Sequence, residues 1–86
     1  MPEISRFLGI VVAMFYREHA PPHFHARYRD LEIRVDIRTG EILTGGFPPR
    51  ARRLVLEWLE LHREELMEDW ELAQDRKPLK PIDPLE

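Results

Sequence analysis

The fold is decided by residues 23–38, which read HFHARYRDLEIRVDIR. In the second half of this stretch apolar and charged residues alternate, as they do in a strand with one buried face. The apolar positions are Leu31, Ile33, Val35 and Ile37. Arg29 and Asp30 form a turn between two strands, so the stretch predicts a β-hairpin. Its outward face would carry His23, His25 and Arg27 together with Glu32, Arg34 and Asp36.

Further strands are predicted on both sides of this hairpin. Residues 4–8 and 10–16 are short apolar segments separated by Gly9, and residues 41–44 follow a tight turn at Gly40. Glycine suits these turns because it adopts a positive φ without a steric penalty. The sequence therefore predicts an antiparallel sheet of four or five short strands and leaves their order open.

A long amphipathic helix is predicted for residues 50–74. Its apolar side chains recur at intervals of three and four residues, which gives a continuous stripe. They are Leu54, Val55, Trp58, Leu59, Leu61, Leu66, Trp70 and Ala73. A straight helix of about two dozen residues would be roughly 36 Å long, which exceeds the width of so small a sheet. We therefore expect a bend or a break at residues 61–64.

The last segment of the chain is rich in proline. Three prolines recur at three-residue spacing within residues 76–86, which excludes a helix and favours extended, polyproline-like backbone. This tail either frays or lies against a partner or against the protein's own surface. Residues 1–86 are interpreted as one α+β domain, in which the helix packs on one face of a sheet formed by residues 1–46.

The composition narrows the function classes. The 86 residues include no cysteine, which excludes disulfides and thiol catalysis and restricts a metal site to His, Asp and Glu ligands. Residues 1–53 hold nine arginines against six acidic residues, whereas residues 54–86 hold ten acidic against four basic residues. Only the sheet face could therefore attract nucleic acid. Neither a signal pattern nor a membrane-spanning run is present, so we expect a soluble cytoplasmic protein.

Three of the four histidines fall within residues 18–25, EHAPPHFH. The two prolines stiffen this segment, and strand geometry puts His23 and His25 on one face within about 7 Å of each other. This pattern is typical of a site for a divalent metal such as zinc. The candidate ligands are His19, His23 and His25, with a fourth from Glu18, Glu32 or Asp36. The structural alternative is that His25 belongs to a hydrogen-bonded sheet face and His19 caps the loop.

A metal-free ribonuclease is a second hypothesis. It needs a histidine pair as acid and base and a cation over the phosphate. These roles are open to His23, His25 and either Arg27 or Arg34. The acidic helix and the absence of lysine before residue 77 count against this activity.

A binding module without catalysis is the third hypothesis, and the one we favour. Arg50, Arg52 and Arg53 cluster at the start of the helix, where the helix dipole is already positive. An anion or an acidic partner held there would explain this arrangement. The predicted binding surface therefore includes Arg34, Arg50 and Arg53, together with the sheet edge and the tail.

Several segments together resemble a known family of small prokaryotic proteins. They are residues 1–4 (MPEI), 7–12 (FLGIVV), 18–26 (EHAPPHFHA), 40–43 (GEIL), 58–66 (WLELHREEL) and Trp70. In these segments the chain is similar to domain of unknown function 4160. The resemblance implies a protein often encoded beside a second small family, domain of unknown function 2442, in an arrangement similar to a toxin–antitoxin pair. We therefore expect a cognate small protein as partner, and the resemblance supplies no activity or cofactor.

Overall fold

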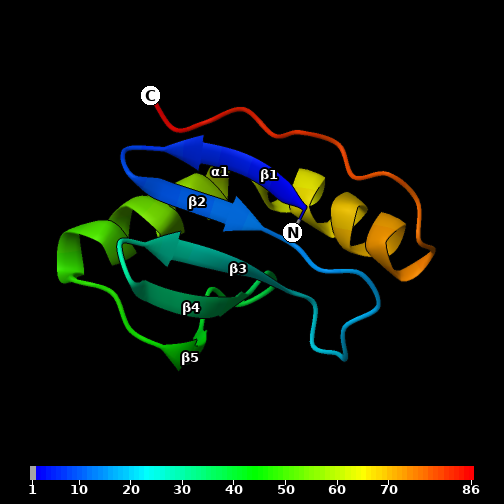
Figure 1. Ribbon diagram of the computed structural model, residues 1–86, viewed down its shortest axis with the longest axis horizontal. Coiled ribbons are helices and arrows are strands. Elements are labelled where there is room, and N and C mark those ends of the chain that lie inside the picture. Colours follow the sequence, from blue (N-terminus) through cyan, green and yellow to red (C-terminus); the bar gives the residue numbers. More distant parts are fainter. Residues whose placement is uncertain (1) are drawn as a thin grey trace.

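The computed structural model describes residues 2–86 of the chain. Five strands precede one long helix: β1 (Glu3–Phe7), β2 (Ile10–Ala13), β3 (His23–Tyr28), β4 (Leu31–Asp36), β5 (Ile42–Gly45) and α1 (Pro49–Gln74). Each strand pairs antiparallel with the next, so the sheet order is β1-β2-β3-β4-β5 (Figure 1). The predicted α+β fold is confirmed, and the strand order is that of a simple meander.

The molecule has two layers, with α1 behind one face of the sheet and the other face left open (Figure 1). Alternate residues of the strands point toward α1 and form the core with its apolar stripe. Trp58 of α1 is at the centre of this core, with its ring 5.4 Å from that of Phe7 and 5.8 Å from that of Phe24. Burying one such aromatic side chain stabilises the fold by roughly 1.5 to 3 kcal/mol.

The helix α1 bends at His62, where φ is −128° and ψ is 22°. This position lies within residues 61–64, the segment for which the sequence predicts a bend. Next to it, Arg63 Nε donates a hydrogen bond of 2.9 Å to the carbonyl of Ile37, which ties α1 to the chain that follows β4. Within residues 2–86, no helix has the length and apolarity that a membrane crossing would require.

The proline-rich tail lies against the protein's own surface, which is one of the alternatives that the sequence leaves open. It runs back from the end of α1 along the edge strand β1 (Figure 1). There the Ile82 amide donates to the Ile4 carbonyl at 2.8 Å, and the Trp58 indole N–H donates to the Asp83 carbonyl at 2.8 Å. The tail thus covers an edge that would otherwise expose unpaired backbone groups.

Strand β2 ends at Ala13, three residues earlier than the predicted segment 10–16. Ala13 is opposite His25 in the pairing with β3. The chain leaves the sheet after β2 and forms the loop that leads to β3.

Candidate metal centre

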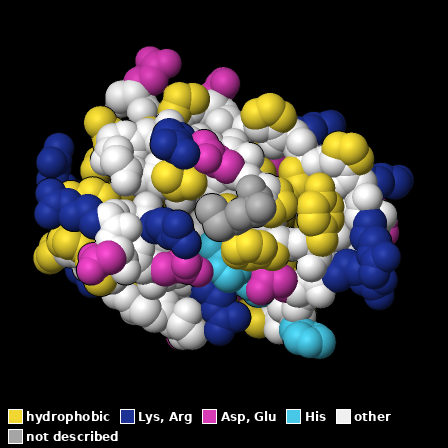
Figure 2. Space-filling model, viewed as in Figure 1, with side chains coloured by type: hydrophobic (Ala, Val, Ile, Leu, Met, Phe, Trp, Pro, Cys, Tyr) yellow, Lys and Arg dark blue, Asp and Glu magenta, His cyan; other side chains and the backbone are white. Residues whose placement is uncertain are grey.

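The hairpin of β3 and β4 puts two histidines side by side on the open face of the sheet. In this hairpin His23 is opposite Asp36 and His25 is opposite Arg34, so the histidines share a face with Arg34 and Asp36, as the alternation in the sequence predicts. The ring centroids of His23 and His25 are 5.3 Å apart. Figure 2 shows histidine surface near the middle of this face, between acidic side chains.

Glu18 is brought against these histidines by the loop between β2 and β3. Arg17 adopts a left-handed conformation, with φ at 58°, which redirects the chain just before Glu18. Gln74 Nε2 donates to the Glu18 carbonyl at 3.1 Å and so ties the loop to the end of α1. Glu18 Oε1 is consequently 2.6 Å from His25 Nε2 and 3.2 Å from His23 Nε2.

The second nitrogen of each ring faces another oxygen acceptor. His23 Nδ1 is 2.8 Å from the Pro21 carbonyl oxygen, and His25 Nδ1 is 3.2 Å from Glu32 Oε2. Because a carbonyl oxygen only accepts, His23 Nδ1 carries the hydrogen, and Nε2 of the neutral ring presents a lone pair. His25 has a carboxylate oxygen beside each of its two ring nitrogens. Because a neutral ring carries only one N–H, its other nitrogen presents a lone pair to a carboxylate.

His23 Nε2 is a buried atom without a hydrogen-bond partner. The His23 side chain is only 4% exposed, and Glu18 Oε1 lies 3.2 Å from this nitrogen, where it faces the lone pair when the ring is neutral. Leaving such a buried nitrogen unsatisfied costs about 1 to 3 kcal/mol. A cation between the nitrogen and the carboxylate would replace this repulsion by attraction to both.

The donor set and its spacing fit a divalent metal ion. Glu18, His23 and His25 each offer one ligand atom, and these atoms lie within 4.8 Å of one another. Ligands of a tetrahedral zinc ion are roughly 3.3 Å apart, given metal–ligand distances of about 2.0 to 2.1 Å. In addition, ligating histidines usually donate their other N–H to a carbonyl or carboxylate. Pro21 and Glu32 provide such acceptors here.

The sequence profile described as Domain of unknown function (DUF4160) matches residues 9–71, a span that includes the whole candidate centre. The chain belongs to the DUF4160 family. The family predicted from the sequence is thus confirmed, and its profile covers the molecule from β2 to the last turns of α1. No curated protein and no solved structure matches the chain.

The centre of this DUF4160 protein differs in one ligand from the set predicted from the sequence. His23 and His25 converge, whereas His19 is exposed and lies outside the group. Glu18, one of the predicted fourth ligands, takes the third place. The other predicted carboxylate of the hairpin, Asp36, instead accepts hydrogen bonds from the amides of Arg38 and Thr39. The periodicity of the sequence does not predict that Glu18 replaces His19, because the conformation of the loop between β2 and β3 determines which residue turns toward the histidines.

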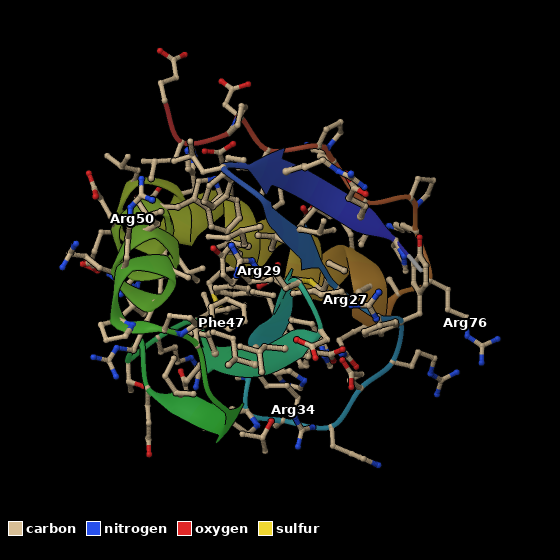
Figure 3. All side chains as sticks on the ribbon, turned by 60° about the vertical axis from the view of Figure 1, so that its left-hand side comes forward. Arg27, Arg29, Arg34, Phe47, Arg50 and Arg76 are labelled. Atoms are coloured by element: carbon tan, nitrogen blue, oxygen red, sulfur yellow. The ribbon has the colours of Figure 1, made fainter. Side chains whose placement is uncertain are left out.

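The predicted arginines do not form one site in this DUF4160 protein. Arg27 is exposed and lies 3.7 Å from Glu32, and Arg34 Nε donates to Thr44 Oγ1 at 3.1 Å. Arg50 is exposed at the start of α1, away from the sheet residues Arg27 and Arg34 (Figure 3), and Arg53 is an exposed residue of the same helix. The sheet arginines are therefore the cations that flank the histidines.

Proposed function

We propose that this DUF4160 protein binds one divalent transition-metal ion through Glu18, His23 and His25. The observation that carries the proposal is the buried His23 Nε2, which faces a carboxylate and has no hydrogen-bond partner. Two imidazole nitrogens and one carboxylate oxygen are ligands that suit zinc and leave a coordination position open. At that position the ion would act as a Lewis acid toward an incoming oxygen ligand.

The metal-free ribonuclease is less well supported by the same geometry. A histidine pair that acts as acid and base must reach the attacking and the leaving oxygen of a phosphate. Here the Nε2 atoms of His23 and His25 are both directed at one oxygen of Glu18, and the His23 ring is almost fully buried. This arrangement supports the shared ligation of one cation better than it supports two separate proton transfers.

The role as a partner-binding component of a toxin–antitoxin-like gene pair stays a prediction that rests on the family resemblance. Its test is expression of the chain with and without the neighbouring gene. We expect the two products to purify together in a fixed ratio through size-exclusion chromatography. Isolation of the chain alone, together with unchanged host growth and RNA content, would contradict this role.

The metal site is tested with untagged protein that has been stripped by a chelator and reloaded with Zn²⁺. We expect native mass spectrometry to show one zinc ion per chain. Glu18→Gln and His25→Ala should each lower the zinc affinity by at least about tenfold, because loss of even an outer-shell partner has an effect of that size. Circular dichroism of each variant establishes that it is folded.

His19→Ala is the variant that separates the ligand set of the structure from the set predicted from the sequence. His19 is next to Glu18 in the chain but lies outside the group of ligand atoms, so His19→Ala should keep the full zinc affinity. An equal loss in His19→Ala and His25→Ala would favour the three-histidine set instead. If no stoichiometric ion binds to the wild type, the proposal is wrong.

A further inference from the structure

A groove of about 480 Å³ opens beside the candidate metal centre. Its lining comes from the loop between β2 and β3, from the start of β3, and from β4 and β5. Glu18 and His23 belong both to this lining and to the candidate metal centre. A ligand in the groove would therefore be next to an ion held by these two residues.

Arg34 of β4 presents a fixed guanidinium to this groove. The residue is opposite His25 on one side and Thr44 on the other, so it lies in the same row of the sheet as the histidine (Figure 3). Its Nε donates to Thr44 Oγ1 at 3.1 Å, which orients the side chain. Among residues 2–86, no side chain or carbonyl accepts a hydrogen bond from its two terminal nitrogens. These nitrogens form the fork that binds oxyanions in a bidentate manner.

The charges around the groove favour an anion once a metal ion is in place. Arg17 and Arg34 are the cationic side chains of its lining, and Glu18 is the single acidic one. A divalent ion bound to Glu18 would more than neutralise that carboxylate. The groove would then present two guanidinium groups and one open coordination position to a ligand.

We propose that this groove binds a phosphate group, with one oxygen on the metal ion and two on the Arg34 fork. The inference rests on the proposed metal binding and adds the chemical class of the ligand. A phosphate monoester has three unesterified oxygens, which is enough for a metal ion and a bidentate guanidinium together. A carboxylate has only two, so it could not satisfy both partners in this way. The diester of a nucleic acid likewise has only two unesterified oxygens, so the groove should favour a monoester over a diester.

The test uses Co²⁺-loaded protein, because the visible spectrum of Co²⁺ responds to its ligands. Co²⁺ is added first, without phosphate, and its affinity is measured. Methyl phosphate, a monoester, and dimethyl phosphate, a diester, are then titrated separately. We expect methyl phosphate to change the spectrum saturably and to bind more tightly than dimethyl phosphate, which has one unesterified oxygen fewer.

Arg34 variants test whether the Arg34 guanidinium binds the phosphate in the groove. Arg34→Gln should weaken methyl phosphate binding to the Co²⁺-loaded protein at least about tenfold, since charge-assisted hydrogen bonds are lost; the Co²⁺ affinity of each variant is measured first, so that the two effects are separated. Arg34→Lys should lose less, because it keeps the charge without the fork. Arg52→Gln, an exposed arginine of α1 outside the groove, serves as the matched control and should bind as the wild type does.

The possible results distinguish failure of the phosphate inference from failure of the proposed metal binding. If Co²⁺ binds but methyl phosphate does not change the spectrum, or binds no more tightly than dimethyl phosphate, the phosphate inference is wrong and the metal site stands. Ester binding that is equally strong in Arg34→Gln and the wild type would also overturn the inference. If Co²⁺ itself does not bind, the proposed function is wrong, and the phosphate inference is wrong with it.

Discussion

Among residues 2–86, three buried side-chain atoms have no hydrogen-bond partner, on Ser5, His23 and Asp69, and the last two differ in what surrounds them. One is the candidate metal centre, with His23 Nε2. The other is Asp69 of α1, which is 1% exposed; its Oδ1 accepts the Lys80 amide at 2.9 Å while Oδ2 has no partner. Around His23 further ligand atoms converge from a loop, and a groove opens beside them. Asp69 holds the protein's own tail by a backbone hydrogen bond.

The comparison shows how to separate a ligand site from a structural anchor. An unpaired buried atom indicates a ligand where other donors converge on it and the surface gives access. Where a single carboxyl group is enclosed by the chain, the group can respond by holding a proton. Burial raises the pKa of Asp69 above its usual value, although the hydrogen bond from the Lys80 amide acts in the opposite direction.

The largest expected effect is stabilisation of the candidate centre by metal. At a free Zn²⁺ concentration about one hundred times the Kd, the folded state gains about 2.7 kcal/mol. For a domain of this size the gain corresponds to a rise in Tm of roughly 10 to 20 °C. Calorimetry should show this rise for the wild type and for Asp69→Asn, and its loss in Glu18→Gln. Loss of the rise in Asp69→Asn as well would mean that the two regions are not independent.

The next effect concerns the tail anchor in the absence of metal. Asp69→Ala removes the acceptor of the Lys80 amide and should lower the free energy of unfolding by about 1 to 3 kcal/mol. Glu68→Gln is the matched control, because Glu68 is an exposed neighbour that pairs with the Lys80 side chain. We expect a change within about 0.5 kcal/mol for this control. Urea unfolding measures both, and equal midpoints would show that Asp69 does not anchor the tail.

A smaller effect is the pH dependence that Asp69 imposes on stability. Because burial raises its folded pKa above the ordinary 3.8, the folded state holds the proton more strongly than the unfolded chain does. The stability contributed by this group is present at pH values below 3.8 and is lost as the pH rises through the raised folded pKa. Asp69→Asn should remove this loss.

The pH prediction is measured as a difference between two proteins, which cancels the titration of the other groups. Urea midpoints of the chelator-treated wild type and of Asp69→Asn are compared from acidic to neutral pH. We expect the wild type to lose stability relative to Asp69→Asn as the pH increases. A difference that stays constant, or one that changes in the opposite direction, would show that the Asp69 carboxyl is not perturbed by burial.

Most of the fold was accessible from the sequence because periodic patterns encode it. The alternation in residues 31–37 predicts the face that His23 and His25 share with Arg34, and the structure adds that His25 is opposite Arg34. The length of the apolar stripe in α1 predicts a bend, which occurs at His62. Docking of the tail was left open, because it depends on single contacts such as that between Trp58 and Asp83.

The candidate site was predicted less completely, because its geometry depends on a loop. Strand alternation puts His23 and His25 on one face. No periodicity applies to residues 17–22, so the sequence could not show whether Glu18 or His19 turns toward them. The chain turns at Arg17, which adopts a left-handed backbone conformation just before Glu18. An arginine side chain does not indicate that its backbone will adopt this conformation. The burial of His23 likewise follows from tertiary packing against Trp70.

The smallest expected effect on stability, in metal-free protein, is that of replacing His23 itself. His23→Phe removes an unpaired buried nitrogen and keeps an aromatic ring beside Trp70, whose ring is 5.2 Å away. The Pro21 carbonyl loses its N–H donor in a part-buried hydrogen bond, and because Pro21 is an exposed residue we expect water to replace that donor. We expect the free energy of unfolding to change by less than about 1 kcal/mol, because loss of a hydrogen bond and relief of an unsatisfied atom offset each other.

The same variant should lose zinc binding completely. His23 would then be needed for metal binding and not for folding, whereas Asp69 is needed for folding. A residue retained for ligation can be replaced without loss of stability in the metal-free state, whereas a residue retained for folding cannot. His23→Leu tests whether any destabilisation of His23→Phe comes from the larger ring. If both variants destabilise the metal-free protein as much as Asp69→Ala does, the imidazole is held for the fold and the centre loses its strongest physical argument.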